Sequence, residues 1–471
     1  MSYFDEASLV MIPSGYKDQK VYSVKPINGD GDFTFSRASE ATRLVDGVVT
    51  KVRTNSLTYS NDFSNAIWQK NVSTVTSGQA DKDGGTDAWL LDKTAAYGYV
   101  RQDGSFSGVN SISIYAKAGT LNWMRVIASG GSSTPSTWFD LANGVVGAAD
   151  YFTIGSSIES VGNGWYRCSI TFDAGTFVGA RFYPADGNND VSGTSGNILI
   201  QSAQIEQGLV ATDYIATTTV AVSEGPVANM PRLNSVAGGC PSLLLEPQRT
   251  NLITQSEYFG GTYWTKLGAT IVDNSIASAD GYVNASKLVE DTSTGIHVIY
   301  QNAGVTIASG TATLSVFVKE NGRSFFQIRT GSAAGITNAP LYANFDLVNN
   351  LVTAQSVGAD SAIIEAYPNG WKRVSVSFTL TSGSVVALVF QTITSGTAVI
   401  AESYTGDGTS GVYIYGAQLE EGSYATSYIP TYGTAATRIA DAASKSGISS
   451  LIGQTEGTIF VEANLSNIID P

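Results

Sequence analysis

Few residues in this chain could do chemistry. His297 is the one histidine of the sequence, so a Ser-His-Asp relay or a histidine-based metal site would have to use it. His297 lies in Gly-Ile-His-Val-Ile-Tyr-Gln, an alternating pattern typical of a β-strand. We therefore interpret it as a structural or surface residue and expect no catalytic residues.

Two glutamates recur in matching contexts, Glu206 and Glu420. A pair of carboxylates could in principle hydrolyse a glycosidic bond. These two belong to separate copies of a repeat, so they cannot face one substrate. We interpret each as a strand-end carboxylate that binds nearby backbone or an arginine, and we expect the protein not to be an enzyme.

Acidic, glycine-containing stretches are the candidates for metal binding. They are Asp81–Gly84, Asp186–Asp190 and Asp407–Gly408. Calcium takes six to eight oxygen ligands, but none of the stretches has the spacing of a dedicated calcium loop. The sequence also has no glycine-rich phosphate loop. We expect simple turns, no metal and no cofactor.

Tryptophans divide into two groups when the repeat is taken into account. Two pairs recur in both copies, which predicts core positions: Trp68 with Trp264, and Trp165 with Trp371. Trp89, Trp123 and Trp138 have no counterpart. An aromatic ring beside Asp and Asn side chains is a usual way to hold a sugar, so these three are candidate carbohydrate-binding residues, with burial in a core or interface as the alternative.

The sequence contains two copies of one module. The endings are Gly196–Thr217 and Gly411–Thr431, which share Ala-Gln, Glu, Gly, Ala-Thr and Tyr-Ile at matching positions. The beginnings are Arg-Thr-Asn at Arg53 and again at Arg249. Inside each copy an Asn-Gly dipeptide precedes a tryptophan and an alternating strand pattern, which predicts a β-hairpin.

Short apolar runs broken by Gly, Ser, Asn and Asp predict an all-β protein of tandem antiparallel β-sandwich (jelly-roll) modules after an extended N-terminal segment. The expected divisions are 1–52 for N-terminal attachment, 53–217 for module 1, 218–248 for a rigid proline-rich connector, 249–431 for module 2, and 432–471 for a linker with the first strand of a lectin-like module. Within the last segment we expect a helical turn at Ala435–Lys445 and a strand at Gly457–Asn464.

The amino-acid composition limits the classes of partner that the chain is expected to bind. Only 14% of residues are charged, and 26 Lys and Arg against 40 Asp and Glu give a net charge of −14. That charge opposes attraction to nucleic acid and to anionic membranes, and we expect neither as a partner. The two cysteines, Cys168 and Cys240, imply no disulfide framework. We expect the chain to fold in a reducing cytoplasm.

Three groups of sequence motifs together indicate a known kind of protein. They are EASLVMIPSGYKDQKVYSVKP with FSRASEATR, the connector NMPRLNSVAGGCPSLLLEPQRTNLITQSEYF, and AQLEEGSYATSYIPT. The chain resembles virion fibre and tail-associated proteins of bacteriophages, especially crAss-like and other Bacteroides phages. The first copies of two motifs are degenerate, at Val52–Thr58 and in IEQGLVATDYIAT.

The resemblance implies a homotrimeric head or tail fibre of the virion, assembled in the bacterial host cytoplasm. Residues 1–52 would attach to capsid or tail proteins, and carbohydrate-binding-module-like sandwiches would be strung outward from them toward host-surface glycans. Two alternatives remain open: a depolymerase of capsular polysaccharide, and a purely architectural collar or linker protein.

Overall fold

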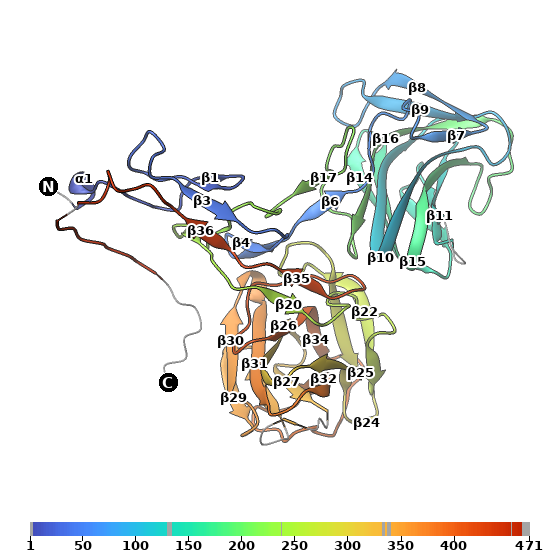
Figure 1. Cartoon of the computed structure of the whole chain (residues 1–471). Helices are drawn as coiled ribbons and strands as arrows, with labels where there is room; N and C mark the ends of the chain where they lie inside the picture. Colours follow the sequence, from blue (N-terminus) through green and yellow to red (C-terminus); the bar gives the residue numbers. More distant parts are fainter. Residues whose placement is uncertain are drawn as a thin grey trace.

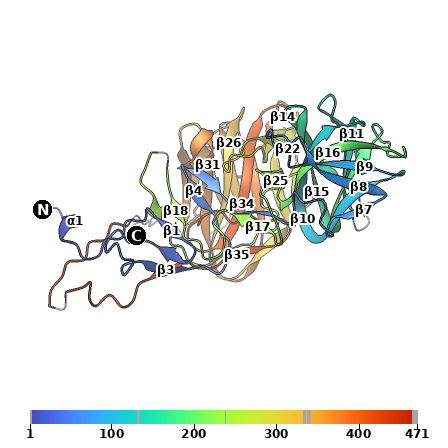
Figure 2. The same cartoon turned by 90° about the horizontal axis from the view of Figure 1, so that it is seen from above.

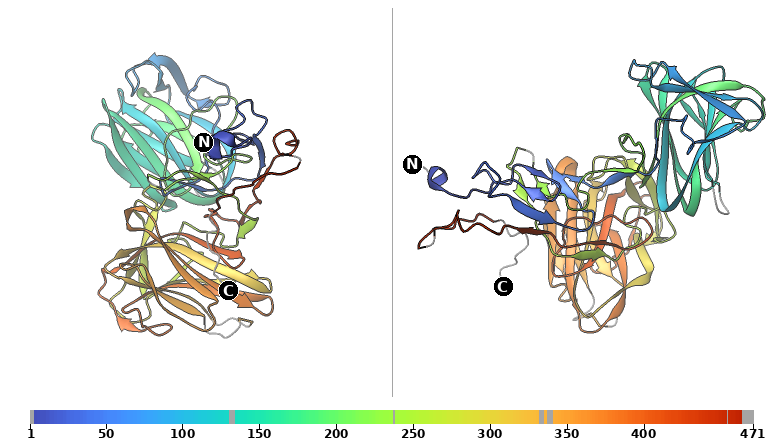
Figure 3. Two further views of the ribbon diagram at one scale, coloured as in Figure 1. Left: turned by 90° about the vertical axis from the view of Figure 1, so that its left-hand side faces the viewer. Right: turned by 45° about the horizontal axis from the view of Figure 1, so that its top comes forward.

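The computed structural model describes residues 3–129, 134–236, 238–331, 335–336, 341–453 and 455–463. The chain forms tandem antiparallel β-sandwich modules, as predicted, with module 1 beside module 2 (Figure 1). The N-terminal segment and the residues after module 2 extend together to one side of the modules (Figure 3). In the described ranges no helix is long and apolar enough to cross a membrane.

Module 1 is one ten-stranded antiparallel sheet folded into two layers (Figure 2). Its strand order is β13-β12-β11-β15-β10-β16-β9-β8, with β14 beside β15 and β7 beside β10. The strands are β7 (Gln69–Asn71), β8 (Ser73–Gln79), β9 (Ala88–Lys93), β10 (Tyr99–Ala118), β11 (Trp123–Ser129), β12 (Ser136–Asp140), β13 (Val145–Ala149), β14 (Thr153–Gly162), β15 (Trp165–Ala185) and β16 (Gly196–Gln207). β10 and β15 run through both layers, and their pairing shifts register between Asp103 and Val109.

Module 2 has two separate six-stranded sheets. Their orders are β21-β25-β32-β27-β28-β29 and β22-β23-β34-β26-β31-β30. The strands are β21 (Thr265–Leu267), β22 (Ala269–Ile276), β23 (Ala285–Glu290), β25 (Val298–Ile307), β26 (Gly310–Asn321), β27 (Phe325–Thr330), β28 (Tyr342–Asp346), β29 (Leu351–Gln355), β30 (Ser361–Ala366), β31 (Lys372–Leu380), β32 (Ser384–Ile393) and β34 (Gly411–Glu421). A small pair, β24 (Thr294–Gly295) with β33 (Tyr404–Thr405), and the 3₁₀ turn η1 (Pro368–Gly370) complete the module.

The two modules share one topology. The order in each layer of module 1 is the order of one module 2 sheet, with β10 corresponding to β25 plus β26, and β15 to β31 plus β32. The predicted Asn-Gly turns are confirmed. Asn163 and Gly164 have φ of 55° and 75°, and Asn369 and Gly370 have φ of 59° and 80°, the left-handed conformation that a two-residue hairpin turn requires.

The duplicated tryptophans are core residues, as predicted. All four are at most 1% exposed. Trp68 and Trp264 lie against the main apolar cores, where each indole nitrogen donates to a backbone carbonyl nine residues earlier. Burying rings of this size contributes much of the apolar stabilisation of a small sandwich, which explains why both copies keep them.

The segments outside the sandwiches pair with one another. The N-terminal segment contains helix α1 (Tyr3–Glu6), and its sheet β1-β2-β3 continues into a strand from beyond module 2. These strands are β1 (Tyr16–Lys17), β2 (Lys20–Val21), β3 (Phe33–Ser36) and β36 (Ala442–Ser444). Four further pairs are β4 (Arg43–Val45) with β5 (Val48–Thr50), β6 (Arg53–Asn55) with β17 (Val222–Glu224), β18 (Leu233–Asn234) with β19 (Ser242–Leu243), and β20 (Arg249–Asn251) with β35 (Ala436–Arg438).

Three sequence expectations are corrected here. The helical turn expected at Ala435–Lys445 is instead the strands β35 and β36, because each pairs with a segment far away in the sequence. The pairing of β3 with β36 also returns the chain to its N-terminal segment, so the sandwiches are not strung outward in a line. Residues 457–463 of the expected strand form no strand, and Asn464 lies outside the described residues.

A buried ionic network joins these segments. Asp441 accepts from Arg37 at 3.1 Å and pairs with Arg232, and all three side chains are inaccessible to solvent. Glu246 lies 2.7 Å from Arg232 and 3.1 Å from Arg438. Because these five residues come from the N-terminal segment, the connector and the region after module 2, the network fixes all three together.

Candidate functional site

The repeated glutamates stabilise the module endings. Glu420 accepts from the backbone N–H of Thr426 at 2.8 Å, from its hydroxyl at 2.6 Å and from the Gln418 amide at 2.7 Å. Glu206 makes the same contacts with Thr212 and Gln204, and its burial raises its pKa. The interpretation of these carboxylates as structural is confirmed.

His297 and Cys168 are also buried in module packing. His297 is fully buried, with Nδ1 2.5 Å from the carbonyl oxygen of Gly268 and Nε2 3.1 Å from that of Tyr404. Burial in the core of module 1 raises the pKa of the Cys168 thiol well above its usual value, so the thiol stays protonated. His297 is a structural residue, one of the two interpretations made from the sequence, and Cys168 is a buried thiol of the module 1 core.

The acidic loops use their carboxylates on their own backbone. Asp81 accepts from the N–H groups of Asp83, Gly85 and Asp87, and these bonds lower its pKa. Asp407 accepts in the same way from Thr409 and Ser410. Across the residues described, no group of three or more His, Cys, Asp or Glu side chains could hold a metal ion.

The three candidate tryptophans fall in two places. Trp89, on β9, donates its indole N–H to the carbonyl oxygen of Asn61 and packs at the edge of the module 1 core. Trp123 and Trp138, on the neighbouring strands β11 and β12, share a cluster on the outer face of one layer. Trp123 is partly exposed, whereas Trp138 is 5% exposed.

Around these two tryptophans the structure gathers further aromatic rings and two arginines. We call this set the aromatic–arginine face: Tyr99, Trp123, Arg125, Trp138, Arg181 and Tyr183. Arg125 lies opposite both Tyr183 and Trp138 in the strand register. Its guanidinium is 4.9 Å from the Trp138 ring, and that of Arg181 is 5.2 Å from the Tyr99 ring.

The same face of module 2 is closed. Three amide side chains take the places of the module 1 residues. By strand register, Gln327 corresponds to Arg125, Asn344 to Trp138 and Gln391 to Tyr183. All three amides are fully buried. The loop between β32 and β33 lies over them, and its carbonyl groups accept hydrogen bonds from each amide at 2.8 to 3.2 Å. The aromatic–arginine face therefore belongs to module 1 alone.

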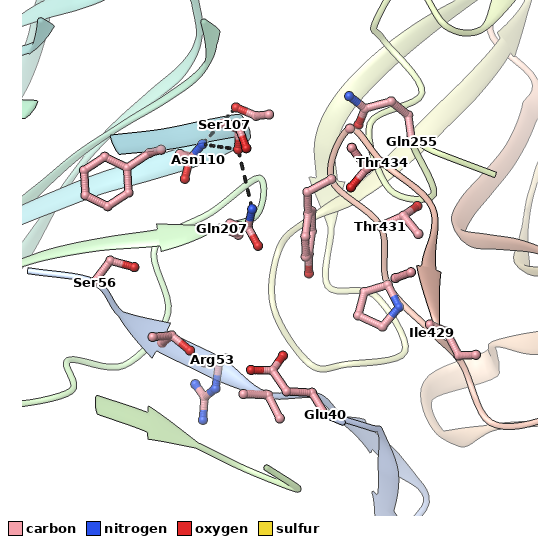
Figure 4. Close-up of a pocket in the computed structure, with 18 of the residues that line it drawn as sticks. Glu40, Arg53, Ser56, Ser107, Asn110, Gln207, Gln255, Ile429, Thr431 and Thr434 are labelled. Carbon is pink, nitrogen blue, oxygen red and sulfur yellow. Dashed lines mark hydrogen bonds between the residues drawn. The ribbon is translucent and has the colours of Figure 1, made fainter. Parts of the chain in front are cut away.

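A large cleft lies between the modules and the N-terminal segment (Figure 4). Its volume is about 1150 Å³, and its lining includes Glu40, Arg53, Gln207 and Gln255. Several lining polar groups are already bonded within the protein. Asn110 donates to the carbonyl oxygens of Ser107 and Gly108, as Figure 4 shows in part. The cleft thus offers a ligand fewer free polar groups than its size suggests.

Arg125 and Arg181 were not among the residues predicted from the sequence. A signal was present, because Trp123 and Arg125 alternate on one strand and so share a face. The partner strands β12 and β15 and the loop that closes the equivalent face of module 2 become evident only in the structure.

No family model and no curated protein matches the sequence. Among solved structures, the chain is similar to the N-terminal CBM22-1-CBM22-2 tandem domain of Paenibacillus barcinonensis Xyn10C. The identity is 14%, the coverage is 82% of this chain and 100% of that chain, and the TM-score is 0.23. It is also similar to the oxalate decarboxylase of Lactobacillus farciminis (8% identity, 83% and 89% coverage, TM-score 0.14). A third is vicilin of Corylus avellana (7% identity, 70% and 84% coverage, TM-score 0.12).

Proposed function

We propose that this protein binds a saccharide on the aromatic–arginine face of module 1 and acts as a non-enzymatic attachment component of a virion fibre. The observation that carries the proposal is the difference between two copies of one fold. Module 2 covers this face with a loop, whereas in module 1 the rings of Tyr99 and Trp123 remain partly exposed.

The chemistry of the face suits a sugar. A pyranose ring has an apolar face of C–H groups that packs on an aromatic ring, and a rim of hydroxyl groups that needs planar hydrogen-bonding partners. Trp123 and Tyr99 supply rings. Arg125 and Arg181 supply donors that are positioned by stacking on Trp138 and Tyr99, so little side-chain freedom is lost when a ligand binds.

The virion role is supported by the motifs that resemble phage fibre proteins. In this proposal residues 1–52 contact capsid or tail proteins, three copies of the chain assemble, and the mature location is the virion. The buried ionic network around Asp441 supports a structural role, because it fixes the N-terminal segment to the connector and to the chain after module 2.

A glycan array probed with the intact chain tests the binding proposal. We expect binding to a subset of host-surface glycans, and Trp123→Ala should weaken it at least about tenfold. The matched control is Phe325→Ala, because Phe325 holds the equivalent position in module 2, and it should leave binding unchanged. Absence of binding by the unaltered chain to every glycan of the host surface would refute the proposal.

Light scattering tests the assembly proposal separately. The intact chain at micromolar concentration should have three times the monomer mass of 49.4 kDa. A density map of the virion should then place residues 1–52 against the particle. A monomer, or a particle without this protein, would contradict the fibre assignment without bearing on saccharide binding.

A further inference from the structure

We propose that the saccharide held by module 1 carries a carboxylate, as uronic and sialic acids do, and that Arg125 and Arg181 bind it. This inference rests on the proposed function and names the class of ligand. The two arginines lie close together on one face of the sheet. Arg125 lies opposite Tyr183 on β15, and Arg181 is two residues from Tyr183 on the same strand. Diagonal neighbours of this kind have Cα atoms about 7–8 Å apart.

Neither arginine is neutralised by the protein. In the described part of the chain no carboxylate lies within 4.0 Å of either guanidinium, whereas Arg101 on the same sheet pairs with Asp103 at 3.2 Å. Arg125 donates to the hydroxyl of Ser136 at 3.0 Å, a neutral partner. Its partial burial lowers its pKa, and the nearby Tyr183 and Asp150 act in the opposite direction. A partly buried cation without a counter-ion is stabilised by binding an anion.

The two arginines also distinguish module 1 from its copy. Their counterparts in module 2 are Gln327 and Val389. By contrast Arg167 recurs as Arg373, and each of these donates to an equivalent serine hydroxyl on the neighbouring strand. Module 2 also carries an arginine on its closed face, Arg329, whose Nε donates to the buried side chain of Gln391 at 3.0 Å. The two modules therefore differ in where their arginines lie on this face.

The overall charge makes this placement selective. The chain carries a net charge of −14, so most of its surface repels an acidic polysaccharide and a cationic face guides such a ligand to one place. A guanidinium matches the planar, two-oxygen geometry of a carboxylate. The aromatic rings beside it would pack against the sugar ring that bears the carboxylate.

The test compares acidic oligosaccharides with their carboxyl-reduced forms, which keep every ring and replace the carboxylate by an alcohol. The probes are uronic-acid and sialic-acid oligosaccharides, applied to the intact chain. We expect the acidic forms to bind at least about tenfold more tightly than the reduced forms. Equal binding would overturn this inference and leave saccharide binding intact, whereas absence of binding to both forms and to neutral glycans would overturn the proposed function.

Variants then assign the effect to the two residues. Arg125→Gln and Arg181→Val introduce the side chains that module 2 carries at these positions, and each should reduce the preference for the acidic form at least about fivefold. Arg329→Gln, in module 2, is the matched control and should not change it. A preference that survives in the double variant would refute the role of these arginines, and because the reduced-glycan comparison uses the unaltered chain, it stands even if a variant fails to fold.

Discussion

Lys51 lies 2.8 Å from Glu257, although 206 positions separate them in the sequence and Lys51 precedes module 1. Both side chains are buried, and Asp280 is 3.1 Å from the same ammonium group. Burial alone would lower the pKa of Lys51, but Glu257, Tyr432 and Asp280 raise it well above its usual value. The N-terminal segment is therefore part of the packing of module 2.

Replacing Lys51 should destabilise module 2 strongly. Lys51→Met leaves Glu257 and Asp280 buried without their cation, which costs about 3–5 kcal/mol. Urea denaturation followed by tryptophan fluorescence measures this loss. The control is Lys82→Met, whose partner Asp83 is largely exposed, and it should cost less than about 1 kcal/mol. Equal effects of the two substitutions would show that the buried pair is not specially stabilising.

Glu246 predicts a pH dependence of stability. Burial raises its pKa, but Arg438 and Arg232 outweigh burial and lower it from 4.5 to about 2. Its contribution, roughly 3 kcal/mol, is thus present above pH 4.5 and is lost as the pH falls toward 2. The free energy of unfolding of the unaltered chain minus that of Glu246→Gln should shrink over this range. A difference independent of pH would contradict the prediction.

The glutamate of the module ending predicts a loss of stability without a loss of ligand binding. Glu420→Gln places an amide group where the carboxylate accepts three hydrogen bonds. The expected cost is about 1–3 kcal/mol, with glycan binding by module 1 retained. Glu320→Gln, at an exposed site of β26, serves as the control. Loss of binding at full stability would instead assign Glu420 to a ligand site.

Calcium should not change the melting temperature. The carboxylates of Asp81 and Asp407 are already occupied by backbone N–H groups, so a cation would have to displace those bonds. Differential scanning calorimetry with millimolar calcium and with a chelator tests this. A rise in melting temperature that the chelator reverses would show that a calcium site exists.

Local patterns gave the modules correctly because their determinants are close together in the sequence. The Asn-Gly turns at Asn163 and Asn369 depend on only two residues each. Trp68 and Trp264 were predicted to be core residues because they occur at matching positions in both modules. The segment Ala435–Lys445 was wrongly predicted because its small residues suit a helical turn, whereas the pairing of β35 with β20 decided its conformation. Such pairing depends on residues almost 190 positions away.

The candidate site was predictable only in part. Trp123 and Trp138 were chosen because they lack counterparts, and the structure places them on one face. Arg125 and Arg181 can be assigned to this face only from their neighbours on other strands. Val191, in the loop between β15 and β16, packs into the same cluster but leaves Tyr99 and Trp123 partly exposed. The length of the loop between β32 and β33 can be read from the sequence. That this loop of module 2 folds onto the sheet cannot be predicted from its length.

The pairing of β3 with β36 has a mechanical consequence. Ser36 lies opposite Ala442 in that pair, so the strands that enter and leave the two-module unit run antiparallel and side by side (Figure 1). Tension applied between residues before β3 and residues after β36 would load this short ladder of hydrogen bonds first. Both sandwiches would be shielded from force until the ladder ruptured, after which the whole length of chain between the two strands could extend.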